Sequence, residues 1–183
     1  MSKSKKNVVD PSQIIETYGA DTARWFMLSD SPPDRDLEWT DSGISGSFKF
    51  VNKVWALLIE TKSLDESITT NKKDSFVKEK INEGVYSVSK NIDDFHFNKS
   101  IANLYTLINM MQKSINDKNT SKKILLSGFK TIALLLQPFT PHLSEEMWKE
   151  LGEKDLAINQ KWPEIVGNVE KSISKIAIQI NGK

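Results

Sequence analysis

Residues 121–136 read Ser-Lys-Lys-Ile-Leu-Leu-Ser-Gly-Phe-Lys-Thr-Ile-Ala-Leu-Leu-Leu, the most hydrophobic of the segments with helical periodicity. Ser121 is a suitable N-cap, because its side chain can accept a hydrogen bond from the first turn. Apolar residues then recur at spacings of three and four, at Ile124, Leu125, Phe129, Ile132, Ala133 and Leu136. The stretch therefore predicts a helix in the core of a helical protein.

Three further stretches show the same periodicity, over residues 41–62, 74–92 and 98–115. Asp41 or Ser42 can cap the first of them. Their apolar positions are Ile44, Phe48, Val51, Val54, Trp55 and Leu58, then Phe76, Ile81, Val85, Val88 and Ile92, then Ile101, Leu104, Tyr105, Ile108 and Met111. Four helices joined by short polar loops form a bundle, so the predicted fold class is mainly α.

Two shorter helices are predicted before this bundle. Asp10 is a good N-cap and Pro11 suits the first helical position, so a helix is expected from Pro11 to a C-cap at Gly19. Asp21 is the expected N-cap of a second helix through residues 24–28.

Proline marks two interruptions of helical structure. Pro32 and Pro33 exclude a helix over residues 29–40, where Trp39 is expected to attach the loop to the core. Thr140 and the proline after it predict a last helix over residues 141–152.

The C-terminal residues have a different pattern. Ile176, Ile178 and Ile180 alternate with Ala177 and Gln179, which is the period of a half-buried strand. Asn181-Gly182 is a strong hairpin-turn signal. A short C-terminal β segment is therefore expected, as the first strand of a further domain.

Composition excludes several classes of function. The 183 residues contain no cysteine and two histidines far apart in sequence, so no metal site is expected. No stretch approaches 18 consecutive apolar residues, so no membrane span is expected either. A formal net charge of +1 confines any contact with nucleic acid to a local face. Lys49 and Lys53 lie one helical turn apart and could contact RNA phosphates, although a solvated helix face is the alternative.

The N-terminal residues form the one concentrated chemical signal. Met1-Ser2-Lys3-Ser4-Lys5-Lys6 combines three lysines with two serines and precedes a well-capped helix. Ammonium groups and hydroxyls are ligands for phosphate oxygens. A polyphosphate is the expected ligand, and a frayed, solvated terminus is the alternative.

Several motifs resemble one family. Met1-Ser2-Lys3-Ser4 followed by Asn7-Val8-Val9-Asp10-Pro11 resembles the second signature loop of class I aminoacyl-tRNA synthetases, without the lysine that usually precedes the methionine and with Lys6 where the family often has glycine. The segments at residues 32–39, 42–44 and 50–55 are more similar to leucyl-tRNA synthetases than to the valyl or isoleucyl enzymes. The segment at 138–148 and Trp162-Pro163 fit the same family, so the resemblance covers nearly the whole chain.

The resemblance implies a function. In that family the loop closes over ATP, so Met1, Ser2, Lys3 and Ser4 are expected to bind ATP, and Lys3 is expected to be catalytic by stabilising charge on the transferring phosphates. ATP with Mg²⁺, leucine and tRNA(Leu) are the implied ligands of the parent enzyme. The fragment alone is expected to bind no cofactor and to be inactive. A cytoplasmic location and a monomeric state are also implied.

The resemblance also divides the chain into three parts. Residues 1–40 would end a catalytic domain, residues 41–152 would form the anticodon-binding helical bundle, and residues 153–183 would form a linker and the first strand of a truncated domain. Two alternatives remain, namely the equivalent fragment of a valyl- or isoleucyl-tRNA synthetase and a stand-alone helical module that binds RNA or protein.

Overall fold

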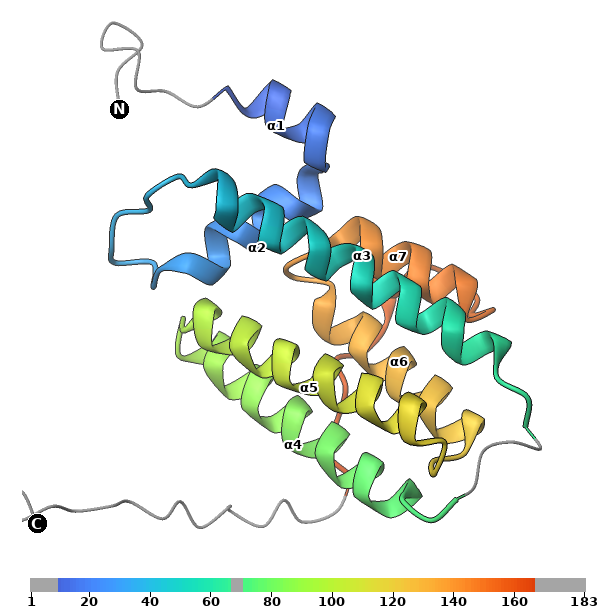
Figure 1. Cartoon of the computed structure of the whole chain (residues 1–183). Helices are drawn as coiled ribbons and strands as arrows, with labels where there is room; N and C mark the ends of the chain where they lie inside the picture. Colours follow the sequence, from blue (N-terminus) through green and yellow to red (C-terminus); the bar gives the residue numbers. More distant parts are fainter. Residues whose placement is uncertain (1–9, 67–70, 167–183) are drawn as a thin grey trace, which may run out of the picture.

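The protein is a bundle of α-helices (Figure 1). The computed structural model describes residues 10–66 and 71–166. The described helices are α1 (Pro11–Tyr18), α2 (Ala20–Asp30), α3 (Asp41–Ser63), α4 (Asp74–Asp93), α5 (Phe97–Asp117), α6 (Lys122–Leu136) and α7 (Pro141–Glu150), followed by a 3-10 turn, η2 (Ala157–Asn159). The mainly α fold class is confirmed. The expected β segment at residues 176–180 lies outside the described residues.

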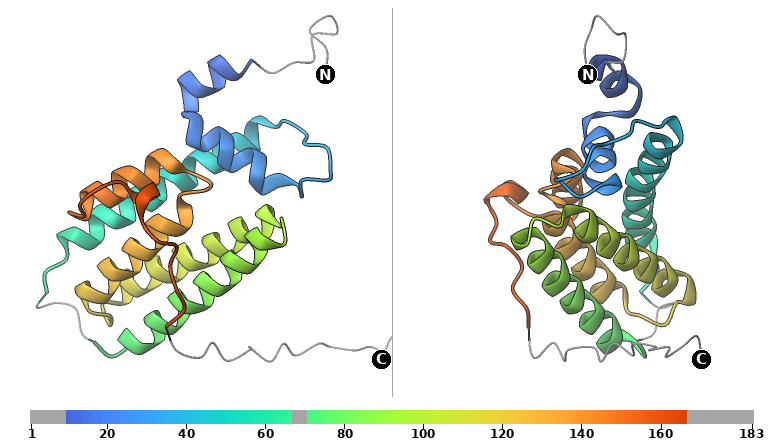
Figure 2. Two further views of the ribbon diagram at one scale, coloured as in Figure 1. Left: turned by 180° about the vertical axis from the view of Figure 1, so that it is seen from behind. Right: turned by 90° about the vertical axis from the view of Figure 1, so that its left-hand side faces the viewer.

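Helix α6 lies inside the bundle, as its composition predicts. It contacts α3, α4, α5 and α7, and Leu125, Phe129 and Ile132 are fully buried. Helices α4 and α5 form an antiparallel pair on one side of it, and α3 and α7 lie on another (Figures 1 and 2). The apolar stretch 121–136 thus acts as the central element against which the other helices pack.

Helix α2 shares this core, although it precedes the long helices in sequence. The Trp25 side chain is 0% exposed and stacks on Phe50 of α3, with ring centroids 4.6 Å apart. Its indole Nε1 donates a hydrogen bond to the Tyr105 hydroxyl on α5 at 3.0 Å, and its ring packs edge-on against Phe139. Buried indole groups need such a polar partner. This aromatic cluster joins α2 to three other parts of the bundle.

Two aromatic residues predicted to be buried are exposed instead. On α3, Phe48 is 39% exposed and contacts Tyr18, whereas Phe50 is 5% exposed. On α4, Phe76 is exposed and its neighbour Val77 is buried. On α3 the prediction was wrong because the buried face includes polar residues, which a pattern of apolar spacing does not contain.

Those buried polar residues satisfy their hydroxyl groups within the helix. Ser47 donates to the carbonyl oxygen of Gly43 at 3.0 Å, and Thr61 donates to that of Leu57 at 2.7 Å. Serine and threonine can therefore occupy the core face of α3 without an unsatisfied hydrogen bond. The buried face of α3 is thus shifted relative to the predicted stripe.

Helix caps agree with the sequence in part. Asp10 caps α1 as predicted, since its carboxylate accepts from the N–H of Ser12 at 2.9 Å. Thr40 caps α3 by accepting from the N–H of Gly43, so the expected caps Asp41 and Ser42 are wrong by one or two residues. Helix α2 begins after Gly19, which has a φ of 84°, and Asp21 does not cap it. Its carboxylate has a different role.

Candidate nucleic-acid interface

The four residues expected to bind ATP lie outside the described residues. Met1, Ser2, Lys3 and Ser4 precede residue 10, where the description begins. Helix α1 starts directly after it, at Pro11, and packs against α2 and α3. The phosphate-binding role of Lys3 therefore stays a prediction. The structure describes the helices that follow the N-terminal residues.

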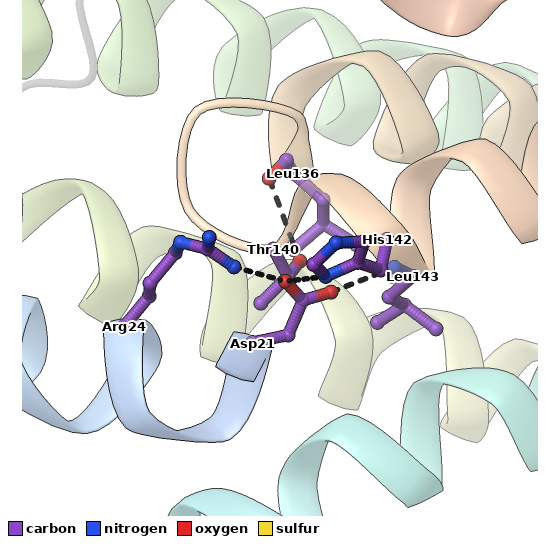
Figure 3. A network of polar contacts seen from close by, with 6 residues as sticks. All are labelled: Asp21, Arg24, Leu136, Thr140, His142 and Leu143. Atoms are coloured by element: carbon purple, nitrogen blue, oxygen red, sulfur yellow. Dashed lines mark hydrogen bonds and ion pairs between the residues drawn. The ribbon is translucent and has the colours of Figure 1, made fainter. Parts of the chain in front are cut away.

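A network of polar contacts around Asp21 attaches α2 to α7 (Figure 3). Asp21 is 7% exposed. Its Oδ2 accepts from the backbone N–H of Leu143 at 2.7 Å, and its Oδ1 lies 3.0 Å from both Arg24 Nη1 and His142 Nδ1. One carboxylate is therefore shared by donors from its own helix and from the first turn of α7.

The contact with Leu143 makes Asp21 a cap for α7. The N–H groups in the first turn of a helix lack partners within the helix, and a negative charge is favourable there. Thr140 occupies the N-cap position of α7, but its hydroxyl is 3.4 Å from the carbonyl oxygen of Leu136 and makes no capping bond. A carboxylate 122 residues away in sequence supplies that bond instead. Sequence reasoning missed this role because it sought each cap beside its own helix.

The two lysines predicted to contact RNA lie on α3. Lys49 is exposed, and Lys53 one turn later is partly buried. Lys53 Nζ donates to Asn109 Oδ1 on α5 at 2.8 Å. An ammonium group has three donors, so this bond orients the group and leaves two donors for another ligand. The structure therefore places Lys53 against α5, and the exposed Lys49 one turn earlier on α3.

Several other cations near the bundle surface have a carboxylate partner. Ion pairs join Lys62 with Glu150, Lys73 with Asp117, Lys80 with Glu83, Lys90 with Asp94, and Lys130 with Glu153. Within residues 10–66 and 71–166, neither Lys49 nor Lys53 forms an ion pair. Their charges are not neutralised by a neighbouring carboxylate, which suits them to phosphate.

Glu145 has a structural role. Its carboxylate accepts from the N–H groups of Ala157 and Ile158 at 2.7 and 2.9 Å, and from Gln137 Nε2 at 2.7 Å. These bonds attach the segment after α7 to the bundle. Farther along, Trp162 Nε1 donates to the Ser89 hydroxyl on α4 at 2.7 Å. The described C-terminal segment is thus held across the bundle by side chains.

No described helix is long and apolar enough to cross a membrane, and the described residues contain no group of three or more histidine or acidic side chains that could hold a metal ion.

Comparison with known proteins places the chain in a family context. It is 42% identical to the leucine–tRNA ligase of Jannaschia sp. (strain CCS1), over 100% of this chain and 22% of that protein. It is 43% identical to the leucine–tRNA ligase of Dinoroseobacter shibae, over 100% of this chain and 21% of that protein. The chain thus spans about a fifth of the length of these relatives.

A solved structure and two family models agree with these relatives. The LeuRS of Agrobacterium radiobacter K84, in a ternary complex with tRNA and LeuAMS, is 28% identical with a TM-score of 0.79, over 90% of this chain and 22% of that chain. Residues 1–40 match the model of class I tRNA synthetases for I, L, M and V. Residues 74–183 match the model described as the anticodon-binding domain of tRNA ligase. Because that match covers more than half of its length, the chain belongs to the anticodon-binding domain family of tRNA ligases.

Proposed function

We propose that this chain is the tRNA-binding helical part of a leucine–tRNA ligase. The parent enzyme would activate leucine with ATP and transfer it to tRNA(Leu). Relatives with this name match the whole chain at about 40% identity, and the LeuRS structure similar to it holds tRNA. These relatives do not favour a valyl or isoleucyl enzyme or a stand-alone module. A cytoplasmic location and a monomeric state belong to the same proposal.

The bundle would support tRNA through its backbone. Lys49 and Lys53 carry this part of the proposal, because they lack carboxylate partners and Asn109 holds one of them in place. Lysine contacts with phosphate position RNA without reading its sequence. We therefore expect binding that depends strongly on salt and little on the identity of the tRNA.

Met1, Ser2, Lys3 and Ser4 would contribute to ATP binding in the parent enzyme. Charge develops on the phosphates as the leucine carboxylate attacks, and a positioned ammonium group stabilises that charge. Lys3 would supply this group, with Mg²⁺ on the same phosphates. We expect the 183-residue chain alone to form no leucyl-adenylate, because it spans about a fifth of its relatives' length.

The experiment that tests the bundle's role is a filter-binding titration of the 183-residue chain with tRNA(Leu) and with a non-cognate tRNA, over a range of salt concentrations. When a protein neutralises phosphates, the logarithm of its affinity falls linearly with the logarithm of the salt concentration, and the slope reports the counterions released. We expect this slope to be similar for both tRNAs. The double variant Lys49→Ala, Lys53→Ala should reduce the slope by about 1 for each lost contact.

Lys123→Ala combined with Lys154→Ala is the control, because these lysines are exposed, as Lys49 is, but lie on α6 and after α7. The control pair should leave the slope close to that of the wild type. Equal losses from both pairs would show that total charge matters rather than the face between α3 and α5. Absence of binding at low salt would reject the proposed function of the chain.

A further inference from the structure

The loop between α2 and α3 meets the turn between α4 and α5 at one end of the molecule (Figures 1 and 2). The two segments border an open hollow of about 440 Å³. That volume lies within the usual range for sites that bind small molecules or parts of larger ligands. The loop lines the hollow with Arg35. The turn and the start of α5 line it with Phe95, His96, Asn98 and Lys99.

Phe95 is an unusual residue for the position it occupies. Its side chain is 69% exposed, and its backbone has a φ of 58°. A bulky residue at positive φ is rare, and an exposed phenylalanine gains little from burial. One edge-on contact with Phe97, at a centroid distance of 5.8 Å, supports the ring. An aromatic surface is therefore held at the border of the hollow.

Asn98 provides a hydrogen-bond donor at the same hollow. Its Oδ1 has almost no accessible surface, so a ligand in the hollow cannot reach that oxygen. Its Nδ2 is accessible and forms no hydrogen bond within the described residues. A side-chain amide nitrogen donates to acceptors, and nucleobases carry such acceptors on their edges.

The charges around the hollow favour an anion. Arg35 and Lys99 form neither an ion pair nor a side-chain hydrogen bond within residues 10–66 and 71–166. Two carboxylates also line the hollow, and one of them, Asp94, is paired with Lys90 at 3.0 Å. The lining thus includes two cations without an ion pair, Arg35 and Lys99, and one carboxylate without an ion pair, that of Asp34. Lys99 also helps to lower the pKa of the nearby Asp94.

An exposed ring, an accessible amide N–H group and cations without ion pairs match the chemistry of an unstacked nucleotide. Single-stranded bases stack on aromatic side chains, and amide groups read their edges. We propose that this corner binds one unstacked nucleotide of an RNA, whose base stacks on Phe95 and hydrogen-bonds to Asn98 while Arg35 and Lys99 contact the adjoining phosphates. The inference rests on the proposed function, since tRNA is the RNA it concerns.

The test combines affinity with chemical footprinting of tRNA(Leu) bound to the 183-residue chain. We expect the Watson–Crick edge of one single-stranded base to be protected in the wild-type complex. Phe95→Ala should abolish this protection and weaken binding about ten- to a hundredfold, as for other bases that stack on an aromatic side chain. Phe95→Trp should retain both the base protection and the tRNA affinity, because tryptophan also stacks on bases. Asn98→Ala should leave stacking in place but reduce the protection of the edge of that base.

Phe76→Ala is the matched control, because Phe76 is also an exposed phenylalanine but lies at the opposite end of α4. Thermal unfolding of each variant separates lost binding from lost folding. Equal affinity and an unchanged footprint in Phe95→Ala would overturn this inference and leave the proposed function standing. Weakening by Phe95→Ala without any protected base would also overturn it, because Phe95 would then affect tRNA binding without stacking on a base. If the wild type binds no tRNA, both proposals fail.

Discussion

The Asp21 carboxylate is almost fully buried and is shared by three donors. Two of them are side chains that reach solvent, since His142 is 72% exposed and Arg24 is also exposed. The third is the backbone N–H of Leu143, which has no such alternative. The contact with Leu143 therefore dominates the contribution of Asp21 to stability.

We expect Asp21→Ala to lower the free energy of unfolding by about 2 kcal/mol, because it removes a helix cap and leaves a part-buried N–H group unpaired. Urea denaturation measures this change, with an unchanged slope showing that the fold is retained. Asp36→Ala is the control, since Asp36 is an exposed aspartate in the loop between α2 and α3. A change of less than about 0.5 kcal/mol for Asp21→Ala would show that water replaces the carboxylate.

The ion pair between Lys90 and Asp94 makes a prediction about pH. The hydrogen bond from Lys90 lowers the pKa of Asp94 below its usual 3.8, and the same bond raises the pKa of Lys90 above its usual 10.5. The carboxylate therefore stabilises the fold above pH 3.8 and loses this effect as pH falls through its folded pKa. The ammonium group stabilises the fold below pH 10.5 and loses its effect as pH rises through its folded pKa.

We expect Lys90→Met to raise the pKa of Asp94 toward 3.8. An NMR titration of the side-chain carboxyl carbon follows this pKa directly. Lys149→Met is the control, because Lys149 lies on α7 and its carboxylate neighbour is Glu146. A pKa for Asp94 that is the same in the wild type and in Lys90→Met would show that the pair does not form in solution.

At the scale of single elements, the end of α5 carries a local conflict between residue and conformation. Lys118 follows the helix with a φ of 50° and a ψ of 33°, which is the left-handed conformation. This conformation is sterically unfavourable for residues with a Cβ, and glycine is the usual residue at such a position.

We expect Lys118→Gly to raise the free energy of unfolding by about 1 kcal/mol, because it removes that penalty. Lys113→Gly, an exposed lysine within α5, should instead lower it by about 1 kcal/mol, since glycine weakens a helix interior. If Lys118 has the left-handed conformation, chemical denaturation should show changes of opposite sign in the free energy of unfolding for the two variants. Changes of the same sign would contradict that conformation.

The helices themselves were predictable from sequence, because their apolar residues follow a single period. The ends of α1, α4 and α6 also match the prediction closely, and those of α1 were set by Asp10, Pro11 and Gly19. Ser121 does occupy the N-cap position of α6, but its hydroxyl donates to Asp74 of α4 at 2.7 Å. This contact and the cap that Asp21 provides for α7 join residues far apart in sequence, and no local pattern reveals them.

For the whole molecule, sequence motifs predicted the family, which the comparisons confirm. The phosphate-binding loop lies outside the described residues and stays a prediction. The hollow beside Phe95 was not predicted, because it forms only where two turns meet in the folded chain. Lys49 and Lys53 were singled out by spacing, and their tRNA contact remains a prediction. The hydrogen bond from Lys53 to Asn109 needed the packing of α3 beside α5.

In the full-length parent enzyme, we expect Lys3→Ala to slow leucyl-adenylate formation far more than it weakens tRNA binding. The physical reason is that its ammonium group would act on phosphates of the transition state rather than on RNA. Pyrophosphate exchange measures the first quantity and filter binding the second. Lys49→Ala is the control, and we expect it to weaken tRNA binding more than it slows leucyl-adenylate formation. Equal losses of both activities in Lys3→Ala would count against the phosphate role.

A shortened chain tests how far the bundle depends on α2. Residues 41–166 lack Trp25, so Phe50, Tyr105 and Phe139 each lose one aromatic partner. Loss of a buried tryptophan side chain alone costs about 3–5 kcal/mol. We expect residues 10–166 to unfold cooperatively and residues 41–166 to bind a hydrophobic dye and melt without a sharp transition. Equal cooperativity of the two chains would show that α2 is dispensable.

The position of Trp25 also bears on how related enzymes can exchange segments. A crossover within residues 31–40 would combine the α2 of one parent with the α3, α5 and α7 of another, and would separate both Trp25 and Asp21 from the partners they evolved with. A crossover before Pro11 would keep these partners together. Chimaeras between leucine–tRNA ligases should therefore inherit α2 with the helices that follow it.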